Sequence, residues 1–178
     1  MNNLFISSGF WEAGLFKAAN GSQIDFANLP PFLRVLLTTD GTVTKSLESF
    51  FWEPVRIVNL EQQYIVLTNA VPVLELLPGA EVLRRKVKLV GTRSKREFAV
   101  ARSLIRTEIL EPGVRADLEK GKIGIGELLR ELGLETYREI VEIGSDPKQD
   151  SIWRCYRIMM NHLPLMQITE DFPQSVFS

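Results

Sequence analysis

Residues 82–90, with the sequence VLRRKVKLV, decide the predicted fold of this chain. Side chains alternate between the two sides of a strand, so the stretch presents two different rows. One row is mostly basic and consists of Val82, Arg84, Lys86 and Lys88. The other row is apolar apart from one arginine and consists of Leu83, Arg85, Val87 and Leu89. The pattern predicts a half-buried strand that turns one guanidinium toward the interior.

Further stretches with strand character surround this one in the sequence. They are rich in β-branched residues or alternate in polarity, and they cover residues 55–67, 97–110, 136–144, 151–160 and 163–171. A polar loop at 91–95 connects the strand at 82–90 to the next one, and Asn161 with His162 connects the last two. Neighbouring strands with such short connections predict an antiparallel sheet.

Helical patterns fall between these strands. Residues 44–51 place Leu47, Phe50 and Phe51 on one helical face, with Thr44 as the expected cap and Pro54 as the stop. Residues 32–39 are short and apolar, which suits a helix or a strand. Residues 113–135 are helical in character around a break at 124–126. The helices would cover one face of the sheet, which makes the predicted fold class α+β.

Length and composition set broad limits on the protein. The 178 residues favour a single domain, and the 45% of hydrophobic residues are enough for a sizeable core. Residues 1–29 are predicted to be an N-terminal arm or a short helix. Twenty-one basic and 22 acidic residues argue against a nucleic-acid or membrane-surface protein held by bulk charge. A single cysteine and the lack of a long apolar run predict a soluble, cytoplasmic protein without a membrane span.

Two charged residues stand out because each lies in an otherwise apolar row. Arg85 is one, and Glu170 is the other, since it shares a side of its strand with Met166 and Ile168. Three structural explanations are open: Arg85 could reach solvent at an edge, Glu170 could point to water at its strand end, or the two could pair. A fourth is functional. Both could face an internal pocket, where an arginine would bind a carboxylate through two parallel hydrogen bonds.

Other common sites have little support in the sequence. His162 is the only histidine, which excludes a metal site built from several histidines, and no metal site is predicted. The sequence has no P-loop, no G-x-S-x-G and no complete G-x-G-x-x-G, and the glycines around Ile125 are too few for a nucleotide fingerprint. The basic residues between 84 and 96 fit a solvated hairpin better than a nucleic-acid surface.

Five motifs occur in an order that resembles the chorismate lyases, or chorismate pyruvate-lyases, and especially the branch from photosynthetic bacteria and plastids. The resemblance covers about residues 30–175. The motifs are LLTTDGTVTKSLESFFWEPV at 36–55, LRRKVKL at 83–89, GKIGIGELL at 121–129, ETYREIVEIG at 135–144 and LPLMQITEDFP at 163–173. The resemblance implies a six-stranded antiparallel sheet with helices packed around an internal ligand cavity. It also implies conversion of chorismate to 4-hydroxybenzoate and pyruvate without a cofactor. The 4-hydroxybenzoate would be used for quinone (plastoquinone) synthesis.

The resemblance also assigns roles to individual residues. The family's arginine for the ring carboxylate matches Arg85, with Arg84 as the alternative if the alignment slips by one residue. Alternation favours Arg85, because such a slip moves a side chain to the other face. The family's glutamate at the 4-hydroxyl end of the ring matches Glu170, as a base or as a hydrogen-bond partner. Two backbone N–H contributors match Val43 and Ile125.

Two other functional classes are weighed against the enzyme. The same architecture occurs in the ligand-binding domains of transcription regulators, which would make the chain a sensor of aromatic carboxylates. About 30 residues precede the matched region, which is too few for a helix-turn-helix. The other class is an interaction protein in which Arg85 and Glu170 form a core ion pair. If the chain is a chorismate lyase, its product 4-hydroxybenzoate is expected to leave slowly and to inhibit the reaction. The reason is that substrate and product share the carboxylate that Arg85 would hold.

Overall fold

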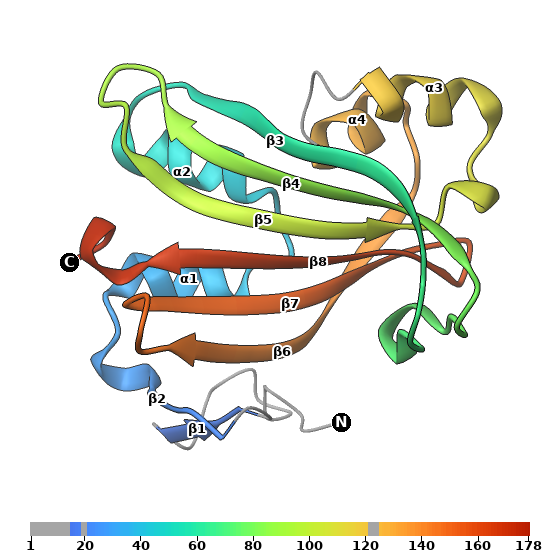
Figure 1. Ribbon diagram of the computed structural model, residues 1–178. Helices are drawn as coiled ribbons and strands as arrows, with labels where there is room; N and C mark the ends of the chain where they lie inside the picture. Colours follow the sequence, from blue (N-terminus) through green and yellow to red (C-terminus); the bar gives the residue numbers. More distant parts are fainter. Residues whose placement is uncertain (1–14, 19–20, 121–124) are drawn as a thin grey trace.

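Six long strands form one antiparallel sheet in the computed structural model, which describes residues 15–18, 21–120 and 125–178. The order across the sheet is β3-β4-β5-β8-β7-β6 (Figure 1). The strands are β3 (Val55–Val66), β4 (Glu81–Gly91), β5 (Glu97–Ile105), β6 (Thr136–Asp146), β7 (Ser151–Met160) and β8 (Leu163–Pro173). Residues 82–90 lie in β4, and the predicted antiparallel sheet is confirmed.

Strand boundaries follow the predictions closely, with one exception. The stretch at 97–110 was expected to be one long strand, but β5 ends at Ile105 and a 3₁₀ helix, Thr107–Ile109, follows. The change comes where the backbone N–H of Arg106 donates to the carbonyl of Leu165 and Thr107 is buried. The predicted hairpin between β7 and β8 is confirmed. Asn161 and His162 have φ values of 50° and 63°, as a two-residue turn that matches the strand twist requires.

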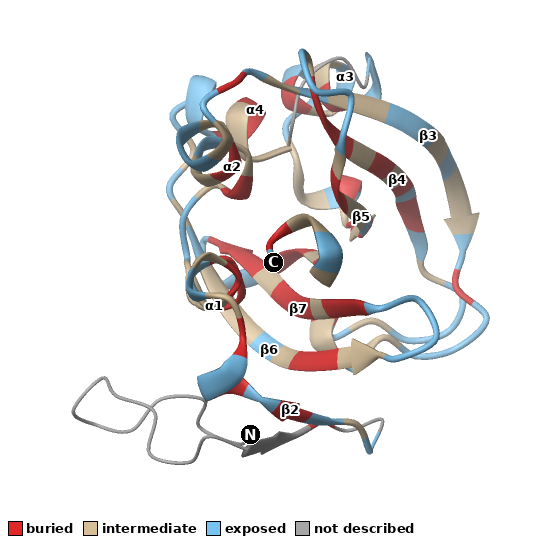
Figure 2. Ribbon diagram, turned by 90° about the vertical axis from the view of Figure 1, so that its left-hand side faces the viewer, coloured by how far each residue is buried: buried red, intermediate tan, exposed pale blue. Residues whose placement is uncertain are grey.

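Four α-helices accompany the sheet. They are α1 (Pro31–Thr38), α2 (Val43–Phe51), α3 (Pro112–Lys120) and α4 (Ile125–Glu131). The open choice for residues 32–39 is settled as a helix, and α2 begins with Thr42 at its N-cap position, earlier than the expected cap at Thr44. Figure 2 shows that the sheet curves strongly and that α1, α2 and α4 lie on its inner side. The fold class is therefore α+β, as predicted.

The inner face of the sheet carries two separate apolar clusters. One packs α1 and α2 onto the sheet and includes Leu36, Leu47, Phe98 and Phe172. The other packs α3 and α4 onto the sheet and includes Leu118, Leu128, Ile158 and Met166. Burying such side chains supplies the main driving force for folding. The residues with chemical interest lie on the sheet between these clusters.

A small second sheet lies at the N-terminal end of the described chain. It pairs β1 (Leu15–Lys17) with β2 (Gln23–Asp25), and a 3₁₀ helix, Phe26–Asn28, follows. Residues 15–17 and 23–25 are thus strands, where the sequence suggested an arm or a short helix. The parts of that prediction that fall on 1–14 and 19–20 lie outside the described residues. Within the described chain, no helix has the length and apolar character needed to cross a membrane.

Candidate active site

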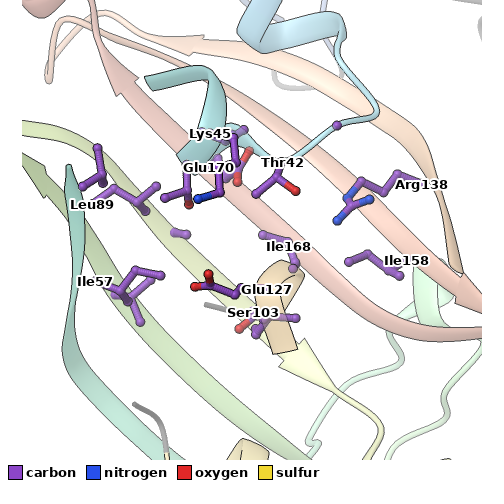
Figure 3. Close-up of a pocket in the computed structure, with 18 of the residues that line it drawn as sticks. Thr42, Lys45, Ile57, Leu89, Ser103, Glu127, Arg138, Ile158, Ile168 and Glu170 are labelled. Atoms are coloured by element: carbon purple, nitrogen blue, oxygen red, sulfur yellow. The ribbon is translucent and has the colours of Figure 1, made fainter. Parts of the chain in front are cut away.

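A cavity of about 350 Å³ lies between the inner face of the sheet and the beginnings of α2 and α4 (Figure 3). Its floor comes from the inward rows of β3, β4, β5, β8 and β7. Those residues are Ile57, Arg85, Val87, Leu89, Ala101, Ser103, Tyr156, Ile158, Ile168 and Glu170. Its opposite wall comes from residues 41–45 and 125–127, with Arg138 from β6. Apolar side chains thus dominate the floor, and charged groups occupy a few fixed places.

Arg85 lies on the inner face of β4 and lines the cavity. Only 2% of the residue is exposed, and burial lowers the pKa of its guanidinium. The guanidinium stays protonated all the same, because arginine does not lose its proton in proteins. Arg84 points to the opposite face, where it forms an ion pair of 2.6 Å with Glu61 and its side chain is 44% exposed. The structure therefore brings Arg85 to the cavity and excludes Arg84 from it.

Glu170 lies on the inner face of β8 and also lines the cavity. It is buried, so it does not point to water as one explanation of the sequence suggested. Its Oε2 accepts a hydrogen bond of 2.8 Å from Nε of Arg154, and its Oε1 accepts one of 3.2 Å from the hydroxyl of Tyr156. Burial and the negative charge of Glu170 raise the pKa of Tyr156, which keeps that phenol protonated as a donor.

Arg154, the ion-pair partner of Glu170, was not singled out from the sequence. Its guanidinium is 1% exposed and lies 4.7 Å from the centroid of the Tyr156 ring, and its Nη1 donates to the carbonyl of Thr39 at 2.6 Å. Arg154 thus connects Glu170 to the segment that leads into α2. The same signal that singled out Arg85 was available, because Arg154 shares its side of β7 with Ile152, Tyr156 and Ile158.

The register of the sheet fixes the spacing between Arg85 and Glu170. Arg85 pairs with Ser103 on β5, and Ser103 pairs with Ile168, two residues before Glu170 on β8. Two strand spacings and one two-residue step separate the α-carbons by roughly 12 Å. A separation of this size places the two side chains on different parts of the cavity floor. The two residues are not partners of each other, because the carboxylate of Glu170 is held by Arg154.

Val43 and Ile125 are the first residues of α2 and α4, and both line the cavity. The first N–H groups of a helix have no acceptor within it. The first helical hydrogen bond of α2 runs from the N–H of Ser46 to the carbonyl of Thr42, whose own side chain makes no capping bond within the described chain. The amide of Val43 is therefore available to a ligand.

The described residues support neither a cysteine nucleophile nor a metal site. Cys155 lies on the outer face of β7, where burial raises the pKa of its thiol and Gln167 donates a hydrogen bond to its sulfur at 3.4 Å. A thiol with a raised pKa is mostly protonated, and only the thiolate acts as a nucleophile. Among residues 15–18, 21–120 and 125–178, no group of three or more His, Cys, Asp and Glu side chains could hold a metal ion.

Comparisons with known proteins agree with this picture. The model of the family described as chorismate pyruvate-lyase Rv2949c-like matches residues 37–177. A chorismate pyruvate-lyase from Mycobacterium leprae is 30% identical over 169 residues, which cover 88% of this chain and 80% of that protein.

Two solved structures have a similar fold. PhnF from Mycobacterium smegmatis superposes with a TM-score of 0.58 at 12% identity, over 79% of this chain and 67% of the other. A GntR-family transcriptional regulator from Bacillus cereus gives 0.51 at 13% identity, over 70% and 94%. At such low identities this likeness concerns the fold alone.

Proposed function

The chain belongs to the Rv2949c-like chorismate pyruvate-lyase family, and we propose that it converts chorismate into 4-hydroxybenzoate and pyruvate. The observation that carries the proposal is the pair of buried charges in one cavity, Arg85 at one end and Glu170 at the other. Chorismate is a small ring with a carboxylate at C1 and a hydroxyl at C4, and these groups lie on opposite sides of the ring. The spacing of the two residues suits that arrangement.

We assign the ring carboxylate to Arg85, whose planar fork can donate two parallel hydrogen bonds. We assign the 4-hydroxyl to Glu170, because a carboxylate has about four acceptor positions and the described residues fill two of them, through Arg154 and Tyr156. The amides of Val43 and Ile125 add donors from the opposite wall. The apolar floor, including Val87 and Ile168, holds the ring and displaces water from it.

The proposed reaction is a redox-neutral elimination. The proton on C4 leaves, its bonding electrons complete the aromatic ring, and the C3–O bond breaks with its electron pair on the oxygen of the departing group. That group gains a proton on its terminal carbon and becomes pyruvate. Aromatisation supplies much of the driving force, so the proposal includes no metal and no redox cofactor. The work of the protein is to orient the substrate and to exclude water.

Two roles for Glu170 fit this scheme, and the variant Glu170→Gln separates them. A glutamine keeps the size and one hydrogen bond but cannot take the C4 proton. A fall in kcat of roughly 10²–10⁴-fold would identify a general base. A much smaller fall would identify a partner that only positions the 4-hydroxyl. Wild-type kcat together with wild-type affinity for 4-hydroxybenzoate would contradict both roles.

The use of the product is a further part of the proposal. We propose that 4-hydroxybenzoate feeds quinone synthesis, as the resemblance to the branch from photosynthetic bacteria and plastids implies, and that branch assignment stays a prediction. A cytoplasmic location belongs to the same proposal and is supported by the single buried cysteine, Cys155, which suits a reducing compartment.

The test is direct. Purified protein is incubated with chorismate, and pyruvate is followed by a coupled dehydrogenase assay while 4-hydroxybenzoate is measured by chromatography. The proposal predicts both products in equal amounts, above the rate of spontaneous chorismate decay. Tight binding of 4-hydroxybenzoate without any turnover would overturn it and would favour the ligand-binding alternative.

A further inference from the structure

Arg138 occupies a place in the cavity that the proposed roles leave unexplained. It lies on β6 opposite Ile158 of β7, and Figure 3 shows its side chain reaching into the cavity toward Thr42. Its Nη1 donates to the carbonyl of Asp40 at 3.1 Å. A Cβ built on Gly126 would lie 3.2 Å from its Nη2, so any larger residue at position 126 would press against the guanidinium. Arg138 is thus held between the segments that begin α2 and α4.

No carboxylate in the described part of the chain matches the charge of Arg138. Among the described residues, no Asp or Glu oxygen lies within ion-pair distance of it, and its hydrogen bond goes to a backbone carbonyl. Lys45, another cation of this wall, is paired with Glu48 at 3.2 Å. Arg154 is paired with Glu170. A half-buried cation held in place by a neutral group is well suited to bind an anion from outside the protein.

Arg138 lies near Tyr156, whose hydroxyl is a hydrogen-bond donor to Glu170. The two residues are close enough for the positive charge of Arg138 to offset part of the rise in the phenol's pKa. Arg138 and Arg85 lie on opposite sides of β8, because β6 and β4 are each two strands from it in the sheet order. An anion held by Arg138 would therefore lie near Tyr156 and away from the carboxylate held by Arg85.

Resting on the proposed function, we propose that Arg138 binds the carboxylate of the enolpyruvyl side chain of chorismate. That side chain is attached at C3, next to the carbon that bears the 4-hydroxyl, so it begins beside Glu170. When the C3–O bond breaks, its electron pair stays on the oxygen of the departing enolpyruvate, and a cation at this place stabilises the charge that develops. Arg138 then recognises the part of the substrate that the aromatic product lacks.

The experiment compares Arg138→Gln with Arg34→Gln. Arg34 is a matched control because it is also half-buried and also donates to a backbone carbonyl, that of Ala27 at 3.1 Å, but it does not line the cavity. Chorismate turnover and the binding of chorismate and 4-hydroxybenzoate are measured for the wild type and both variants. We expect Arg138→Gln to lower kcat/KM for chorismate by about 10- to 100-fold, the range for a charge-assisted hydrogen bond, with the affinity for 4-hydroxybenzoate unchanged. Arg34→Gln should change neither quantity.

Three results would overturn the inference. One is a near-normal kcat/KM in Arg138→Gln. Another is an equal loss of affinity for 4-hydroxybenzoate, which would mean that Arg138 only supports the Asp40 segment. The third is an equal effect of Arg34→Gln. If the wild type makes no pyruvate, the proposed function fails separately, and the titrations decide the inference: Arg138→Gln must then weaken chorismate binding and spare 4-hydroxybenzoate binding.

Discussion

Two buried arginines on the inner face of the sheet, Arg85 on β4 and Arg154 on β7, are used in different ways by the same fold. They are almost equally inaccessible, with 2% and 1% of the residue exposed. Arg154 is neutralised within the protein by Glu170 and is absent from the cavity lining, whereas Arg85 lines the cavity itself. Burial of a charge is therefore a weak sign of a ligand site. What distinguishes the two is whether the guanidinium borders an enclosed space.

The largest expected effect tests the internal partner of this comparison. Arg154→Ala leaves the carboxylate of Glu170 buried without its cation, which costs about 3–5 kcal/mol of unfolding free energy. Urea denaturation followed by circular dichroism measures it. Arg102→Ala is the control, because Arg102 pairs with Asp171 at 2.6 Å on the outer face with its side chain 53% exposed, and surface pairs contribute about 0–1 kcal/mol. Equal losses in both variants would remove the distinction between inner and outer pairs.

Arg85→Ala should reverse the balance between stability and activity. We expect kcat/KM for chorismate to fall at least about 10-fold, because a charge-assisted contact to the ring carboxylate is lost, with a smaller loss of stability than in Arg154→Ala. Steady-state kinetics and the same denaturation experiment provide both numbers. Arg84→Ala serves as the control. Near-normal activity in folded Arg85→Ala would exclude Arg85 from the site. Equal damage from Arg84→Ala would mean that the register by which Arg85 and not Arg84 reaches the substrate is wrong.

The smallest effect concerns release of the product. Arg85 would hold a ring carboxylate that substrate and product share, and the apolar floor around Leu89 and Ile168 suits a flat aromatic ring. Binding that is uniform along a reaction does not speed the chemical step. We expect the Kd for 4-hydroxybenzoate to be no weaker than the KM for chorismate, with progress curves that bend as product accumulates. Linear curves to high conversion with weak product binding would show that the cavity is more open than proposed.

Regular alternation made most of the sheet predictable. The inward row of β4 places Arg85, and that of β8 places Glu170, because a strand lets one face be read from every second residue. Arg154 was missed because both sides of β7 mix an arginine with apolar residues: Arg157 stands on the outer side with Trp153 and Cys155. The pattern there does not say which side faces the cavity.

Other features depended on contacts that no local pattern contains. Arg138 lies just before a register shift between Ile140 and Glu142, which breaks the alternation of β6. The strands at 15–17 and 23–25 are too short for periodicity to register. The start of α2 is set by the backbone of Thr42 and not by the side chain of Thr44. Arg154 could be identified as the partner of Glu170 only from the register of β7 against β8. The sequence predicts the hairpin of these two strands but not which side chains face each other.

The bond from Arg154 to the carbonyl of Thr39 has a consequence for the order in which the molecule assembles. The two residues are 115 positions apart in the chain, and Arg138 reaches Asp40 across 98. The wall that carries Val43 therefore receives its final supports only after β6 and β7 have been made and have joined the sheet. Contacts between such distant segments close slowly, because the chain entropy of the long loop is lost before they form. On the ribosome, the binding cavity would be among the last parts of the protein to take shape.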